Sequence, residues 1–241
     1  MPTRQSFVAH IDILGMRSLT KKDPEAAWSV LSGLANTREH ISKLQLTFIA
    51  SAEQKMLAQD VFSVMFSDTI LLFTKGDSER ELQSILIATG EVLHKAMCNL
   101  VPVRAGVTQG TFFFNIDESM YSGPALIDAY DLGEQAQWLG ITVSEAIFVQ
   151  AKQAKSVPFQ SGTADIVVPA QIPTKAGPIP GYAMNWPAAY SHDFKVPLPI
   201  SVELFYSQFE HMFGPLHALR EQDRIKYVNT TEFINACLQR T

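Results

Sequence analysis

The chain has 241 residues, a length that suits one domain with a few additional elements. Hydrophobic residues make up 46% and charged residues 18%, a balance typical of a globular protein with a substantial core, which excludes disorder of the whole chain. The net charge is −5 and long runs of Lys or Arg are absent, so a protein that coats nucleic acid is not expected. The net charge does not exclude binding of a small anionic ligand, because a single site can be locally positive on a protein that is negative overall.

Cysteine usage and the N-terminus bear on the cellular compartment. Cys98 and Cys237 both fall in apolar helical patterns and are expected to be buried free thiols. The first residues lack the apolar core of a signal peptide, and no apolar run approaches the ~20 residues needed to span a bilayer. We therefore expect a cytoplasmic protein that does not associate with membranes.

The chain begins with a strand and a helix. A mostly apolar strand is expected over 6–12, followed by a turn at Leu14-Gly15. Asp23-Pro24 then starts a helix that runs to about residue 43, with Asp23 as its N-cap. Residues 44–58 are expected to be mixed loop and strand.

Next comes a hairpin and the clearest helix. The short apolar runs 61–66 and 70–74 flank Ser67-Asp68-Thr69, which predicts a hairpin with Asp68 at its tip. Residues 82–100 carry apolar side chains at helical spacing throughout. This segment is therefore expected to form a helix that packs on the sheet.

A strand over 102–108, a helix after Gly123 and a strand over 141–143 complete the pattern. The order β-α-β-β-α-β, followed by α-β, is typical of an α+β fold with a ferredoxin-like core. We expect residues 1–150 to form this core.

Residues 151–241 are expected to pack on the same domain as irregular and helical additions. Eight of the 13 prolines fall between Pro158 and Pro199, which predicts irregular structure with short edge strands at 166–168 and 182–186. Two helices, 201–213 and 216–239, are expected on either side of Gly214-Pro215.

Two aspartates are the strongest candidates for chemistry. Asp12 ends an apolar strand before a turn, and Asp68 lies at a hairpin tip, so a ferredoxin-like core places them side by side. Paired carboxylates with open coordination positions suit Mg²⁺ or Mn²⁺ together with substrate phosphates. Each aspartate alone is equally explained as a turn or capping residue.

Four stretches, in order, resemble the motifs of class III nucleotidyl cyclases. Residues 10–16, His-Ile-Asp-Ile-Leu-Gly-Met, resemble the first metal-binding stretch, and Phe66-Ser67-Asp68 resembles the second. Residues 103–110 resemble the Arg-Xaa-Gly-Xaa-Xaa-Xaa-Gly strand, and residues 123–132 resemble the helix that follows it. The resemblance covers about residues 6–145.

The resemblance implies the fold of a class III cyclase and a homodimer with active sites at its interface. Asp12, Asp68 and the carbonyl of Ile13 would hold two Mn²⁺ or Mg²⁺ ions, and the turn Ile13-Leu14-Gly15 would bind the phosphates of a nucleoside triphosphate. A two-fold pairing is expected to place the aspartates opposite the Arg104 strand of the second copy.

The chain also departs from the family. The helix after Gly123 has Ile127 and Asp131 where cyclases carry an Asn and an Arg that stabilise the transition state. Val64 and Met120 replace the polar residues that read a purine base. These departures disfavour a purine cyclase, and the chain resembles the bacterial Pycsar antiphage cyclases, which make cyclic UMP or cyclic CMP.

Arg104 and His10 complete the candidate residues. Arg104 lies in an apolar strand and is expected to act in catalysis or to contact the base or a phosphate, with an ion pair in the core as the alternative. His10 is expected to point away from Asp12 and to be structural. The leading prediction is a cyclase of UTP or CTP; the alternative is a degenerate domain that binds nucleotide or only dimerises.

Overall fold

The computed structural model of the protein describes residues 5–43, 45–48, 53–56, 60–154, 165–189 and 199–239. Part of the predicted mixed segment 44–58 and the prolines at 158 and 197 therefore lie outside the described residues. Within 44–58, β2 (Gln45–Phe48) and β3 (Glu53–Met56) pair as a separate two-stranded ribbon.

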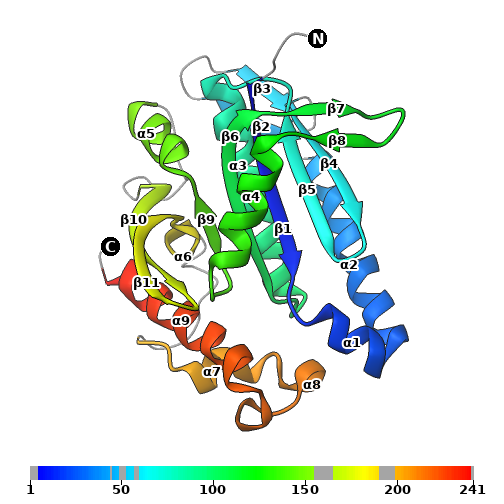
Figure 1. Ribbon diagram of the computed structural model, residues 1–241, viewed down its shortest axis with the longest axis vertical. Helices are drawn as coiled ribbons and strands as arrows, with labels where there is room; N and C mark the ends of the chain where they lie inside the picture. Colours follow the sequence, from blue (N-terminus) through cyan, green and yellow to red (C-terminus); the bar gives the residue numbers. More distant parts are fainter. Residues whose placement is uncertain are drawn as a thin grey trace.

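A seven-stranded sheet organises the described part of the chain, in the order β10-β11-β9-β6-β1-β5-β4 (Figure 1). Its strands are β1 (Gln5–Ile13), β4 (Val61–Phe66), β5 (Thr69–Thr74), β6 (Val103–Thr111), β9 (Ile141–Val143), β10 (Val167–Thr174) and β11 (Gly177–Met184). The central strands β6-β1-β5-β4 are all antiparallel neighbours, and β9 lies parallel to β6. This is the predicted ferredoxin-like core, so the α+β fold class is confirmed.

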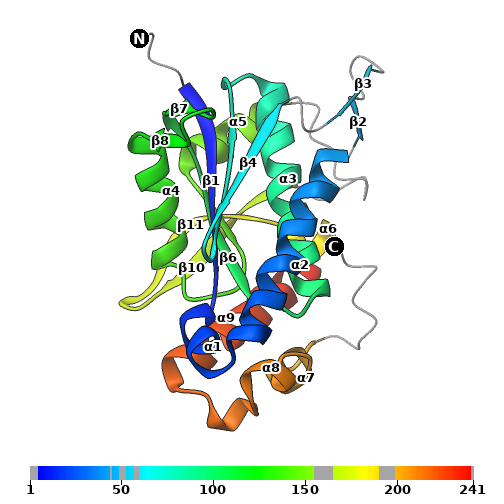
Figure 2. The ribbon, with the colours of Figure 1, turned by 90° about the vertical axis from the view of Figure 1, so that its right-hand side faces the viewer.

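Helices cover both faces of the sheet. α2 (Pro24–Lys43) and α3 (Glu79–Cys98) lie on one face and α4 (Pro124–Gln135) on the other, as Figure 2 shows edge-on. Strand β1 alternates between the two: Ile11 and Ile13 join the larger apolar cluster under α2 and α3, whereas Val8 joins the cluster under α4. His10 and Asp12 share the face of Val8 and so lie on the side of α4.

The glycines of the cyclase-like strand let α4 approach the sheet closely. A Cβ on Gly106 would lie 2.1 Å from the carbonyl oxygen of Ala129, and one on Gly110 would lie 3.3 Å from the Cβ of Ala125. Between them, the hydroxyl of Thr108 donates to the carbonyl of Ala125 at 2.8 Å. The Gly-Xaa-Xaa-Xaa-Gly part of the motif therefore serves helix packing at this site.

The proline-rich segment forms a longer hairpin than the sequence predicted. β10 and β11 pair over eight residues each and extend the sheet beyond β9. Pro173 and Pro178 face one another near the hairpin turn, where β11 no longer pairs with β9. Proline is tolerated there because no neighbouring strand needs its amide.

The C-terminal helices are also shorter and more numerous than predicted. They are α6 (Trp186–Ala189), α7 (Val202–Ser207), α8 (Glu210–Phe213), η3 (Leu216–Ala218) and α9 (Glu221–Leu238). α9 is fixed to the core: the Thr230 hydroxyl accepts the Leu139 amide at 2.8 Å, and the rings of Phe233 and Trp138 lie 4.7 Å apart. Among the described residues, no helix has both the length and the apolar character needed to cross a membrane.

Several local predictions need correction. Several elements were not predicted: the helices α1 (Met16–Lys22), α5 (Glu145–Gln153) and α6, and the ribbon of β7 (Phe113–Asn115) with β8 (Met120–Ser122). Cys98 is exposed rather than buried, because it lies in the last turn of α3 on the side away from the sheet, whereas Cys237 is buried as expected.

Candidate active site

The end of β1 and the tip of the β4–β5 hairpin bring Asp12 and Asp68 together. Asp12 lies opposite Thr69 in the antiparallel register, and the Ile13 amide donates to the carbonyl oxygen of Asp68 at 3.0 Å. This backbone hydrogen bond ties the hairpin tip to the end of β1. The two carboxylates interact electrostatically, since the charge of Asp68 contributes to a raised pKa of Asp12.

The hairpin turn has an unusual backbone at Ser67. Phe66 pairs with Thr69, which leaves Ser67 and Asp68 as a two-residue loop, and Ser67 has a φ of 53°. Such turns favour glycine at the first loop position because it adopts positive φ without strain. Ser67 stands where cyclases usually carry glycine, and it keeps the conformation that positions Asp68.

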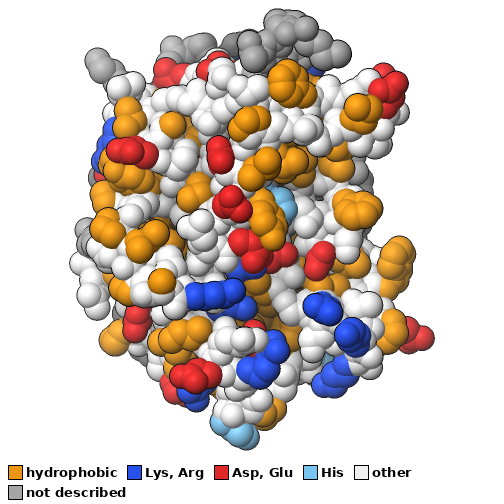
Figure 3. Space-filling model, in the orientation of Figure 1, with side chains coloured by type: hydrophobic (Ala, Val, Ile, Leu, Met, Phe, Trp, Pro, Cys, Tyr) orange, Lys and Arg blue, Asp and Glu red, His pale blue; other side chains and the backbone are white. Residues whose placement is uncertain are grey.

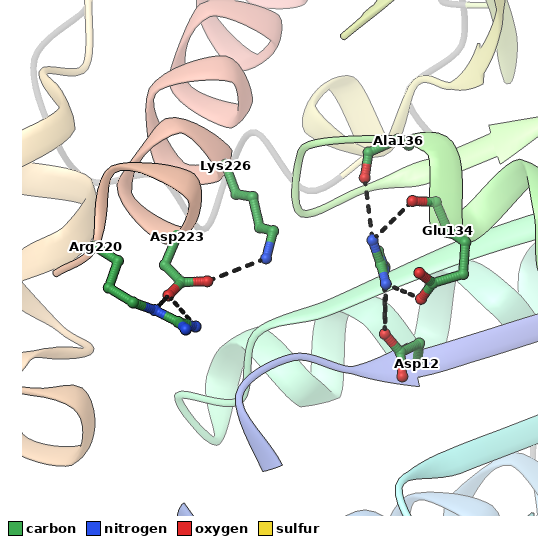
Figure 4. Close-up of polar contacts among 7 residues, drawn as sticks. Asp12, Glu134, Ala136, Arg220, Asp223 and Lys226 are labelled. Carbon is green, nitrogen blue, oxygen red and sulfur yellow. Dashed lines mark hydrogen bonds and ion pairs between the residues drawn. The ribbon is translucent and has the colours of Figure 1, made fainter. Parts of the chain in front are cut away.

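Arg104 lies between Asp12 and Glu134 (Figure 4). Its Nε and Nη2 lie 3.1 and 3.0 Å from the same oxygen of Asp12, Oδ2, and Nη2 also contacts Oε1 of Glu134. Nη1 donates to the carbonyl oxygens of Glu134 and Ala136 at 3.1 and 3.5 Å. These five contacts equal the number of N–H donors on a guanidinium group.

The arrangement bears directly on the role expected for Arg104. Its side chain is only 8% exposed, and a contact to a base or phosphate would have to displace one of its five partners. Arg104 also pairs with Asp12 of its own chain, and the expected placement of the aspartates opposite the Arg104 strand of a second copy stays a prediction. The ion-pair alternative describes Arg104 in this structure; a contact to substrate stays a prediction.

The site fits a divalent cation through the chemistry of its donors. Burial raises the pKa of the Asp12 carboxyl, although Arg104 opposes this, and the charges of Glu134 and Asp68 raise it further. Arg104 already neutralises part of the carboxylate charge of Asp12 and Glu134, so a divalent cation would share this site with a guanidinium group. Carboxylate oxygens are the ligands that Mg²⁺ and Mn²⁺ prefer.

The number of protein ligands is small. In the described parts of the chain, no group of three or more His, Cys, Asp and Glu side chains is arranged to hold a metal ion. Asp12 and Asp68 would thus bind a metal as two carboxylates, with the Ile13 carbonyl as the further ligand that the family resemblance implies. Such sites are completed by substrate phosphates and water.

His10 lies on the same face as Asp12, so the expectation that it points away was wrong. Residues two apart on a strand share a face of the sheet. The His10 ring meets the Tyr130 ring edge-on at 5.2 Å, and burial lowers the pKa of the imidazole, which the charge of Asp12 opposes. His10 therefore packs under α4 beside the site.

The turn predicted to bind phosphates offers fewer amides than expected. The Ile13 amide donates to Asp68, and the Leu14 amide donates to the Pro102 carbonyl at 2.8 Å. Gly15 is exposed, with a φ of 81°, and the ring of Phe213 packs against it. Of the three residues, only Gly15 lacks a backbone acceptor within the described chain, so a phosphate role for Ile13 and Leu14 would need other atoms.

The face around the site divides into acidic and basic areas. Figure 3 shows acidic side chains near the middle of this face and Lys and Arg side chains below them. α1, which follows Gly15, carries exposed Arg17, Lys21 and Lys22. At the start of α9, Asp223 lies between Arg220 and Lys226, at 2.7 and 3.4 Å (Figure 4).

The four residues that depart from the cyclase motifs differ in their exposure. Ile127 is 62% exposed on α4, and Asp131 is exposed one turn later. Val64 packs against the apolar cluster under α4, while Met120 on β8 is 60% exposed. Ile127 and Asp131 cannot supply the amide and guanidinium donors of the missing Asn and Arg, and Val64 and Met120 cannot read a purine edge by hydrogen bonds.

Glu134 is the site residue that the sequence analysis missed. It lies in the last turn of α4, 30 residues from Arg104, and no spacing rule connects the two. The available signal was Arg104 itself, because a buried arginine requires acidic partners.

Comparison with solved structures identifies proteins that share this fold. The catalytic core of a rhodopsin-guanylyl cyclase with converted specificity, determined in complex with ATPalphaS, matches 76% of this chain and 95% of its own, with a TM-score of 0.54 and 13% identity. The chain has a class III cyclase fold. The fold-class prediction is thus confirmed down to its family type, while the low identity says nothing about activity.

A second match is weaker. A class III adenylyl cyclase-like ATP-binding protein from Pseudomonas aeruginosa is 11% identical and has a TM-score of 0.43, over 61% of this chain and 34% of that one. We conclude nothing about this chain from a structural similarity with that TM-score. No protein-family model and no curated protein matches the sequence.

Proposed function

We propose that this protein is a metal-dependent nucleotidyl cyclase that converts UTP or CTP to the 3′,5′-cyclic monophosphate and pyrophosphate. The observation that carries the proposal is the position of Asp12 at the end of β1 next to the hairpin tip of Asp68, which the hydrogen bond from the Ile13 amide to the Asp68 carbonyl holds in place, on a class III cyclase fold. Two carboxylates at the end of one strand and the tip of the adjacent hairpin are what such a reaction requires.

The chain's own residues would hold the reacting groups in place. Asp12 and Asp68 would bind one or two Mn²⁺ or Mg²⁺ ions, which supply charge stabilisation at the reacting phosphate. Gly15, together with the exposed cations of α1, is suited to holding the triphosphate near that site. With the triphosphate fixed there, the ribose 3′-hydroxyl attacks the α-phosphorus and the bond to the β-phosphate breaks.

The proposal includes a homodimer with the sites at its interface. Large apolar side chains are exposed on the ribbon of β7 and β8 and on α4: Phe113, Ile116, Met120, Ile127 and Tyr130. Contiguous exposed apolar side chains of this kind mark interaction surfaces. Light scattering at assay concentration is expected to give twice the 26.7 kDa of one chain, and an active monomer would contradict this part of the proposal.

The preference for a pyrimidine rests on Val64 and Met120. Neither side chain forms the hydrogen bonds that a purine edge requires, and each unpaired polar group costs about 1–3 kcal/mol. We expect UTP or CTP to react at least about 10-fold faster than ATP or GTP on that estimate. A role in antiphage signalling follows only from the resemblance to the Pycsar cyclases.

The test is incubation with each of the four nucleoside triphosphates and Mn²⁺, with the products identified by mass spectrometry. A cyclic pyrimidine nucleotide as the main product supports the proposal. A preference for ATP or GTP would refute the argument from Val64 and Met120, while leaving the cyclase reaction in place.

One observation favours the alternative of a binding domain without turnover. Ile127 and Asp131 occupy the exposed positions on α4 where cyclases carry their transition-state Asn and Arg. In this case the protein would bind nucleoside triphosphates, measured by calorimetry, but release no pyrophosphate from any of them.

A further inference from the structure

The contacts of Arg104 select one of the two oxygens of Asp12. Nε and Nη2 both approach Oδ2, at 3.1 and 3.0 Å, and the described hydrogen bonds leave Oδ1 without a donor. In Figure 4, the second oxygen of Asp12 points away from the guanidinium group. Arg104 therefore fixes the rotation of the carboxylate and presents Oδ1 on the side away from itself.

Glu134 changes the charge of this arrangement. Asp12, Asp68 and Arg104 together carry one net negative charge when ionised, which is a poor match for a divalent cation. Glu134 contacts the same Nη2 as Asp12 and brings the total to two negative charges. A carboxylate that neutralises Arg104 leaves the full charge of Asp12 available to a metal.

Backbone carbonyl groups at the end of α4 and in the loop after it hold this cluster in position. The carbonyl groups of Glu134 and Ala136 accept from Nη1, and the next residue, Gln137, accepts from the Asn229 side chain of α9 at 2.7 Å. Arg104 is thus held by the end of α4 and the loop that α9 supports. A guanidinium with 8% exposure and this many fixed acceptors has little freedom to move.

We propose that Glu134 and Arg104 are positioning residues of the metal site: Arg104 orients Asp12, and Glu134 neutralises Arg104 so that Asp12 and Asp68 bind a divalent cation. This inference rests on the proposed metal-dependent function and deepens it. It assigns a role to Glu134, which the sequence analysis did not include among the candidate site residues, and it gives Arg104 a role that requires no contact with substrate.

The decisive variant is Glu134→Gln. The amide oxygen of glutamine still accepts from Nη2, so the folded protein should unfold at a urea concentration close to that of the wild type. The affinity for Mn²⁺, measured by calorimetry without nucleotide, should fall about 10-fold, because a nearby negative charge is lost in a partly buried site. Asp128→Asn is the matched control: it removes an exposed charge from the same helix, and its Mn²⁺ affinity should stay within about twofold of the wild type.

A second variant tests the orienting role. Arg104→Lys keeps the positive charge but cannot form the same fork of contacts, so Mn²⁺ affinity should also fall. Wild-type affinity in Glu134→Gln overturns the role of Glu134, and wild-type affinity in a folded Arg104→Lys overturns that of Arg104.

The outcomes separate this inference from the proposed function. A protein that binds Mn²⁺, loses affinity in Glu134→Gln and makes no cyclic nucleotide retains the positioning roles but not the cyclase activity. A wild-type protein that binds no Mn²⁺ at millimolar concentration contradicts both.

Discussion

Replacing Arg104 with alanine removes the cation that lies between two carboxylates. Asp12 and Glu134 would then face each other without it, and the carbonyl oxygens of Glu134 and Ala136 would lose their donor. Breaking a fully buried pair in this way costs about 3–5 kcal/mol. Asp12 and Glu134 are 24% and 37% exposed and so keep some hydration, which lowers the expected loss to about 2–4 kcal/mol.

Urea unfolding at pH 7 measures this loss, and Arg220→Ala is the control. Arg220 also pairs with an aspartate, Asp223, but its side chain is 73% exposed, so its removal should cost less than about 1 kcal/mol. A loss in Arg104→Ala no larger than that of the control would refute the reasoning about the buried cluster.

The same variant should show a stronger dependence on pH. The pKa of Asp12 is already raised by burial, and loss of Arg104 raises it further. A carboxyl whose pKa is raised in the folded state stabilises the fold at acidic pH, and this contribution is lost as the pH rises through that pKa. The difference in the free energy of unfolding between the wild type and Arg104→Ala should therefore grow from about pH 4 to pH 7. A difference that stays constant over this range would show that Arg104 does not affect the pKa of Asp12.

Four further substitutions test the two aspartates and the backbone that positions them. Asp12→Ala and Asp68→Ala should each abolish turnover while the protein stays folded, since Arg104 keeps Glu134 as a partner; activity near that of the wild type would remove that aspartate from the metal site. Ser67→Gly should raise stability by up to about 1 kcal/mol in thermal melts, because it relieves the positive φ, and a loss would contradict this account of the turn. Gly106→Ala should cost about 3 kcal/mol or more, since its Cβ would lie 2.1 Å from a backbone oxygen, and a fully stable variant would show that α4 can move.

The core elements follow from periodicity, which is why the sequence predicts them. The helix at 82–100 and the hairpin around Asp68 appear as α3 and β4–β5 with small shifts at their ends. Asp23 caps α2 as expected, accepting the Ala26 amide at 2.9 Å. Local patterns determine these features, so no knowledge of distant contacts is needed.

The prolines of β10 and β11 misled the prediction for a physical reason. Proline disfavours a strand that is paired on both sides, yet β10 is the edge strand, and Pro178 and Pro180 of β11 lie where β11 pairs with β10 alone. Whether a strand is an edge depends on the whole topology, which a local pattern does not contain.

The sequence predicted that Asp12 and Asp68 lie at neighbouring ends of β1 and the β4–β5 hairpin, but it did not predict the contact between Arg104 and Glu134. Asp12 and Asp68 were placed together because the ferredoxin-like order brings their strands together. Glu134 could not be predicted, since its contact with Arg104 depends on how closely α4 approaches β6. The same contact gives Arg104 an ion pair within its own chain, which was the alternative that the sequence analysis left open.

The proposed reaction is tested most directly by its product. Purified protein incubated with UTP or CTP and Mn²⁺ should yield the cyclic nucleotide and pyrophosphate in equal amounts by mass spectrometry. Asp68→Asn, which keeps the shape of the hairpin tip but removes its charge, should yield neither. Absence of a cyclic product from the wild-type protein, or an equal yield from Asp68→Asn, would contradict the conclusion that Asp12 and Asp68 form the catalytic metal site.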